Sequence, residues 1–180
     1  MSDPTRQAAD PGTRAPKKAR EHHRRVISTR DEMRRAAIEV AKTANRSIAI
    51  FTHDLEPGIY DDLDFLEVIK RLILSRAYAR VRVLIADPSR AIKNGNRFVA
   101  LGRRLNSFIE FRHVREDYRA KHREAYCIAD GGGIVYRLDA ARWEGIVDRN
   151  VPAVTDMYLT TFDEIWHASE VEHEFRRLNI

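Results

Sequence analysis

The chain has 180 residues, of which 43% are hydrophobic and 33% charged, as is usual for one soluble globular domain with a substantial core. No segment approaches the roughly 18 apolar residues of a membrane span, and the N-terminus lacks the apolar stretch of a secretory signal. The single cysteine, Cys127, excludes an internal disulfide and says little more. Without a predicted span or signal, we expect a cytoplasmic protein.

The positive charge is concentrated at the N-terminus. Of the formal net charge of +5, the first 25 residues supply seven basic and three acidic side chains, or +4. Three prolines and the near absence of large apolar residues predict that residues 1–25 form a disordered basic tail. Such a tail either contacts nucleic acid or another acidic partner, or is only a solvated leader. Residues 26–180 then form a single, nearly neutral domain.

Helices and strands alternate in the first half of this domain. Thr29 and Glu32 form a capping-box pattern, and apolar residues at helical spacing after them predict a helix that ends near Asn45. The remaining patterns predict a strand over 47–52, a helix from Asp61 or Asp62 and a strand over 79–87.

The second half ends in a hairpin and a helix. Asp130-Gly131 is a strong signal for a tight turn between two strands, because glycine adopts positive φ at little cost. The patterns predict a loop over 88–96, a helix over 97–105, strands over 107–114, 124–130 and 131–138, a weakly patterned region, and a helix over 161–178. This order indicates an α/β layered domain with parallel strands first and an antiparallel pair later.

Four segments, taken in order, resemble one half of a phospholipase D superfamily protein. They are "AKTANRSIAIFTHDL", "LILSRAYARVRVLIAD", "EAYCIADGG" and "FDEIWHAS", and the likeness runs from about Met33 to Ser169. It is closest to an uncharacterised bacterial branch that is sometimes joined to N-acetyltransferase domains. The resemblance implies a phospholipase D-like layered sandwich, a mixed sheet flanked by helices. It also implies a homodimer, because relatives with a single motif pair across the active site.

The catalytic motif of that superfamily, His-x-Lys-(x)4-Asp, is degenerate in this chain. Aligned on Asp130, the histidine and lysine positions hold Arg123 and Ala125; aligned on His122, the lysine position holds Glu124. Arginine binds phosphate but cannot be deprotonated to attack phosphorus. A one-residue slip would turn His122 to the other face of the strand. We therefore expect a pseudoenzyme rather than a phosphohistidine enzyme.

The polar segment "THDLEP" follows the first strand, where ligands usually bind in open α/β sheets. His53, Asp54 and Glu56 either form a ligand site or serve the local turn and cap. The sequence shows no second cluster with metal-ligand spacing, so we expect no metal and no cofactor. The arginines between Arg97 and Arg119 either line an anion site or form a salt-bridged surface.

These observations lead to one leading hypothesis and two alternatives. The leading one is a non-catalytic module that binds a phosphate-containing ligand or regulates a partner; its predicted ligand-binding residues are His53, Asp54, Glu56, Arg123 and Asp130. The first alternative is a phosphodiesterase or phospholipase-type hydrolase with an altered active site, using His53 or His122 with Asp54 or Asp130. The second is nucleic-acid binding through residues 1–25.

Overall fold

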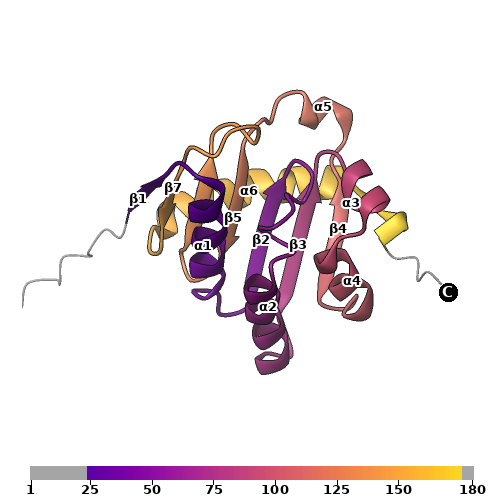
Figure 1. The fold of residues 1–180 in the computed structure, drawn as a ribbon, viewed down its shortest axis with the longest axis horizontal. Coiled ribbons are helices and arrows are strands. Elements are labelled where there is room, and N and C mark those ends of the chain that lie inside the picture. Colours follow the sequence, from indigo (N-terminus) through magenta and orange to yellow (C-terminus); the bar gives the residue numbers. More distant parts are fainter. Residues whose placement is uncertain (1–23, 176–180) are drawn as a thin grey trace, which may run out of the picture.

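The computed structural model describes residues 24–175, which form a mixed sheet with helices on both faces (Figure 1). The strand order is β1-β7-β6-β5-β2-β3-β4-β8. Strands β2, β3 and β4 are parallel, and the other pairs are antiparallel. The strands are β1 (Arg25–Ile27), β2 (Ser47–Thr52), β3 (Arg80–Ile85), β4 (Ile109–His113), β5 (Ala125–Ala129), β6 (Ile134–Arg137), β7 (Gly145–Asp148) and β8 (Glu170–Val171).

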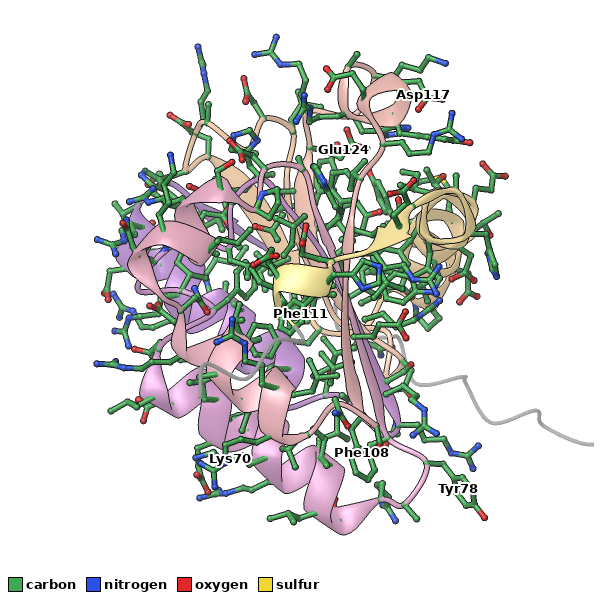
Figure 2. The ribbon with its side chains drawn as sticks, turned by 90° about the vertical axis from the view of Figure 1, so that its right-hand side faces the viewer. Lys70, Tyr78, Phe108, Phe111, Asp117 and Glu124 are labelled. Carbon is green, nitrogen blue, oxygen red and sulfur yellow. The ribbon has the colours of Figure 1, made fainter. Side chains whose placement is uncertain are left out.

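Helices cover the two faces unequally. In Figure 2 the sheet is seen nearly edge-on, with α6 on one side and α1, α2 and α4 on the other. The helices are α1 (Arg30–Ala41), α2 (Leu63–Ser75), α3 (Ser89–Asn94), α4 (Arg97–Arg104), α5 (Glu116–Arg119) and α6 (Pro152–Ala168), followed by the 3-10 turn η1 (His173–Phe175). The predicted α/β layered sandwich with a mixed sheet is confirmed.

The central strand β2 is buried on both faces, which is why its sequence is a continuous apolar run. Ile48 and Ile50 pack in the core beneath α1 and α2. Ala49 and Phe51 pack in the core beneath α6. The carboxyl end of β2 is therefore held rigidly from both sides.

Both helix starts predicted from capping residues are confirmed. The Thr29 side chain accepts a hydrogen bond from the Glu32 N–H, and the Glu32 carboxylate accepts one from the Thr29 N–H, which completes a capping box. Asp62 caps α2 by accepting from the N–H groups of Asp64 and Phe65. These contacts satisfy helix N–H groups that have no partner within their own helix.

Several element predictions were wrong in the loops. The predicted loop over 88–96 contains α3, and the weakly patterned region contains β7 and the start of α6. The last helix begins at Pro152, a residue suited to the first helical position, and it ends at Ala168 rather than near residue 178. The chain then turns back to pair β8 with β4.

The N-terminal boundary also differs from the prediction. Arg25 belongs to β1, which pairs with β7 at the sheet edge, so it is not part of a disordered tail. The rest of the predicted tail, up to residue 23, lies outside the described residues. In the described part of the chain, no helix is long and apolar enough to cross a membrane.

Candidate functional site

A cleft of about 610 Å³ lies at the end of the sheet where β2 and β3 finish and β5 begins. Thr52 pairs with Ile85 at the carboxyl ends of the parallel strands, and Phe51 pairs with Tyr126 near the start of β5. Glu124, which lines the cleft, lies at this end of the sheet in Figure 2. In open α/β sheets the carboxyl ends of the strands are the usual place for a ligand.

Arginines and carboxylates line the cleft in equal number. The arginines come from four separate segments: the start of α1, α3, α5 and the residues before β5. The charged and imidazole side chains in the lining are Arg30, His53, Asp54, Glu56, Arg90, Arg119, His122, Arg123, Glu124 and Asp139. Within this lining there is no lysine. The cleft therefore offers planar guanidinium groups, which bind phosphate in bidentate geometry, and not the flexible ammonium group of a lysine.

Two of these arginines form ion pairs within the lining. Arg90 lies 2.9 Å from Asp54, and Arg123 lies 3.2 Å from Asp139. The Arg123 side chain is 75% exposed, so little holds it in this one pairing.

The other two lining arginines donate to carbonyl oxygens. Arg30 donates to Pro57, and Arg119 donates to Ala86 at 3.2 Å while also pairing with Glu116 on its own helix. A carbonyl oxygen does not neutralise a guanidinium. Arg30 in particular keeps its positive charge without a carboxylate partner among the described residues.

A buried ion pair lies behind the cleft. Arg137 is fully buried and donates to the carboxylate of Glu56, which is itself buried. The same carboxylate accepts a hydrogen bond from the hydroxyl of Thr52. Burial raises the pKa of the neighbouring Tyr60 well above its ordinary value, and the negative charge of Glu56 adds to the effect. Tyr60 therefore stays a neutral phenol.

The guanidinium of Arg137 connects two loops. Its Nη1 donates to the carbonyl oxygens of Ala140 at 2.9 Å and Arg142 at 3.0 Å, and the group lies 5.0 Å from the ring centre of Trp143. Those residues belong to the loop between β6 and β7, whereas Glu56 belongs to the loop after β2. Arg137 thus fastens two opposite parts of the cleft lining to each other.

His122 is oriented by its neighbours. Its Nδ1 lies 2.7 Å from an oxygen of Glu124, and because an ionised carboxylate only accepts, Nδ1 is the donor. The imidazole stacks on Tyr118 and meets Phe51 edge-on. Its Nε2 makes no hydrogen bond with a described residue. This leaves one ring nitrogen available to a molecule in the cleft.

Four of the five predicted ligand-binding residues lie together in the lining, and one does not. His53, Asp54, Glu56 and Arg123 all line the cleft. Asp130 lies at the opposite end of β5, where it accepts from the backbone N–H groups of Asn45 at 2.7 Å and Arg46 at 2.9 Å. Asp130 lies outside the cleft because β5 runs antiparallel to β2 and carries its last residues away from it.

His122, which the motif alignment leaves one residue out of register, also lines the cleft. His122 contacts Phe51, which stacks on Tyr126, and Glu124 and Arg123 line the same cleft. The cleft, however, lies beyond the end of the sheet rather than over one face. Residues of both faces that precede β5 therefore reach it.

Sequence reasoning missed the residues that complete the site. No sequence motif points to Arg30, Arg90 or Arg137. The one signal concerned Arg137, because it is a charged residue at the end of the apolar run "GIVYR". Of the arginines proposed between 97 and 119, only Arg119 lines the cleft. Arg103 donates to the carbonyl oxygens of Glu174 and Phe175 instead, and Arg112 stacks on Trp166.

Metal and thiol chemistry find no support in the described part of the chain. No three histidine, cysteine, aspartate or glutamate side chains of residues 24–175 come together in a way that suits a metal ion. Cys127 is buried in the middle of β5, and burial raises the pKa of its thiol to about 12. It is therefore a packed thiol and not a nucleophile.

Comparison with known proteins gives a family and a fold. A family model described as "Domain of unknown function (DUF7931)" matches residues 29–178. No curated protein matches the chain.

Solved structures with the same fold include two from bacteria. The phospholipase D family member Nuc from Salmonella typhimurium has a TM-score of 0.58 and 15% identity, over 84% of this chain and 99% of that one. NucT from Helicobacter pylori has a TM-score of 0.55 and 12% identity, over 84% and 100%. TrmBL2, an archaeal chromatin protein, has a TM-score of 0.60 and 14% identity, over 86% of this chain and 56% of that protein. The fold is thus phospholipase D-like, as expected.

Proposed function

For this chain, which belongs to the DUF7931 family and has a phospholipase D-like fold, we propose that the cleft binds a phosphate-containing ligand without hydrolysing it. The observation that carries the proposal is the convergence of four arginines from four separate segments on one cleft at the carboxyl ends of β2 and β3. Guanidinium groups on several walls suit an anion with three or more oxygens around one centre.

The carboxylates of the lining argue against phosphoryl transfer. On the strand that would carry the catalytic motif, Glu124 stands two residues after His122 and pairs with it. A carboxylate there repels the charge that develops on a transferring phosphoryl group, where a lysine would stabilise it. Binding of a ground-state phosphate, held by the arginines on the other walls, needs no such stabilisation.

Isothermal titration with inorganic phosphate, sulfate and a nucleotide tests the proposal. We expect the double substitution Arg119→Gln and Arg123→Gln to weaken binding about ten-fold or more, since each charged hydrogen bond contributes roughly 1.5–3 kcal/mol before solvent screening. Arg115→Gln is the matched control, because Arg115 is exposed, pairs with Asp117 and does not line the cleft. If none of the three probes binds, or if the control loses as much affinity, the cleft is not an anion site.

A hydrolase is the second candidate, favoured by the pairing of His122 with Glu124. A carboxylate on Nδ1 orients an imidazole so that Nε2 can act as a base or nucleophile. We expect no turnover of a chromogenic phosphodiester. Turnover by the purified protein that is lost with His122→Ala or His53→Ala would replace the binding proposal by this one.

Two interactions expected from the sequence stay predictions. TrmBL2 is described as showing a novel mode of DNA binding, which fits the hypothesis that residues 1–25 contact nucleic acid. Deletion of those residues should then abolish a salt-dependent affinity for nucleic acid.

A homodimer across the cleft is tested by sedimentation, and Arg123→Gln is expected to weaken the dimer.

A further inference from the structure

The end of the sheet opposite the cleft carries a group of cations, which we call the basic edge. The helices α1, α2 and α4 all finish at this end, and the parallel strands β2, β3 and β4 all begin there. The cations stand in the connecting segments or on the helix and strand residues that border them, and each belongs to an exposed residue: Lys42, Arg46, Arg76, Arg80 and Arg104.

The cations of the basic edge form no ion pairs with described residues. Among the described residues, none of its five cations has a carboxylate oxygen within 4.0 Å. Asp130 lies at this end, but both of its oxygens accept from the backbone N–H groups of residues 45 and 46. Asp130 therefore forms no ion pair with the five cations, although its negative charge remains at this end and leaves the basic edge with a net positive charge.

An open hollow lies between two segments of the basic edge. It has a volume of about 500 Å³, and Arg46 and Arg76 both belong to its lining. Tyr78, which also lines it, is 82% exposed. Figure 2 shows Tyr78 with its ring pointing away from the fold, at the end of the molecule opposite Glu124. An exposed phenol ring beside two guanidinium groups is a combination that the fold does not need for its own core.

Helix ends explain only part of this arrangement. Cations near the carbonyl ends of helices stabilise them, so single members of the basic edge fit a structural role. That role does not account for the exposed aromatic ring of Tyr78 in the same hollow as Arg46 and Arg76, nor for Leu74, also 82% exposed, in the last turn of α2.

We propose that the basic edge binds single-stranded nucleic acid, with the cations on successive phosphates and Tyr78 stacked on a base. Several separated cations fit a polymer with regularly spaced anions better than one small ion. The exposed ring favours a strand with unpaired bases over an acidic protein or a duplex, because every base offers a face for stacking. This surface is separate from the cleft and from the predicted N-terminal contact.

The test measures binding of a labelled thymidine oligonucleotide of about 20 nucleotides over a series of salt concentrations. The full chain is used throughout, so that residues 1–25 contribute equally to every variant. Arg46→Ala with Arg76→Ala should lower the salt slope by about 1.4, since each phosphate contact on a single strand contributes roughly 0.7. Tyr78→Ala should weaken binding about five-fold or more, whereas Tyr78→Phe should keep most of the affinity.

Arg35→Ala with Arg115→Ala removes the same charge elsewhere and is the matched control. A slope that changes equally in both double variants would mean that net charge alone attracts the strand, and it would overturn the proposal. So would binding that is unaffected by all the substitutions, or a duplex or polyglutamate that competes as well as the single strand. Melting temperatures within a few degrees of the wild type show that the variants are folded.

Discussion

The two ends of the sheet use their charges in different ways. At the cleft end, every described arginine has a partner: a carboxylate for Arg90 and Arg123, a buried carboxylate for Arg137, and carbonyl oxygens for Arg30 and Arg119. At the basic edge, none of the five cations pairs with a carboxylate of the described residues, and Arg80 alone among them donates to a carbonyl oxygen of the described residues, that of Ala79. Paired charges hold a defined shape, whereas unpaired and exposed charges set the electrostatic field that a partner meets first.

This difference suggests that the cleft provides specificity for a ligand, whereas the basic edge provides electrostatic attraction for a partner. The cleft is built on a buried network that fixes the positions of its walls, as recognition of one ligand requires. At the basic edge Arg80 donates to the carbonyl oxygen of Ala79 at 2.6 Å and lies over the ring of Phe108, whereas Lys42, Arg46, Arg76 and Arg104 are exposed and form no ion pair with a described residue. Substitutions at the two ends should therefore have different effects on stability, ligand affinity and pH dependence.

The largest effect is expected from Arg137→Met. The substitution leaves the carboxylate of Glu56 buried without its ion partner, which costs about 3–5 kcal/mol of the free energy of unfolding. Urea unfolding measures it, and Arg123→Met, which breaks an exposed pair, should cost about 0–1 kcal/mol. Adding Glu56→Leu to Arg137→Met should recover part of the loss. A loss no larger than that of the Arg123 variant would show that the network does not hold the cleft.

Asp130→Ala should lower stability but leave the cleft unchanged. Asp130 accepts from two backbone N–H groups, so its loss should cost about 1–2 kcal/mol. The affinity of the cleft for phosphate should stay within about two-fold, because the residue lies at the other end of β5. Urea unfolding and titration calorimetry measure the two quantities, with Asp156→Ala on the exposed side of α6 as the control. A large loss of phosphate affinity would mean that Asp130 belongs to the ligand-binding site.

Glu124→Gln should tighten the binding of phosphate about five-fold. It removes one negative charge from the lining, and one charge at about 4 Å in water is worth roughly 1 kcal/mol. Titration calorimetry at low ionic strength measures the change. The same substitution at Glu164, exposed on α6 and outside the lining, should have no effect. Weaker binding after Glu124→Gln would mean that the carboxylate contacts the ligand itself, or that it positions His122 to contact the ligand.

The smallest effect concerns Asp87, in the loop between β3 and α3. Hydrogen bonds from Ser89 hold its pKa below the ordinary 3.8, and the charges of His53 and Arg119 add to this. A lowered folded-state pKa means that Asp87 stabilises the fold above about pH 3.8, and that this contribution is lost as the pH falls further. Asp87→Asn should therefore cost less than about 1 kcal/mol at pH 7 and still less at pH 3. An equal cost at both values in urea unfolding would contradict the lowered pKa.

Local patterns predicted most of the fold because they depend on neighbours in the sequence. The capping box of Thr29 and Glu32 and the apolar run of β2 each depend on residues a few positions apart. The hairpin turn after β5 was also predicted, although the positive φ falls on Gly132 rather than Gly131. Short strands such as β1, at the sheet edge, and β7, next to it, were missed because three or four residues carry too little periodicity.

The site was harder to predict, because charge pairing is not local. Arg137 and Glu56 are 81 positions apart and meet only because β5 and β6 bring the second loop beside the first. The position of Asp130 depends on the direction of β5, which motif spacing does not give. The sequence by itself determined that the chain forms an α/β layered domain with a mixed sheet. Only the tertiary structure decided which charges share the cleft and which stay unpaired at the basic edge, because strand order and direction fix the distances between segments remote in the sequence.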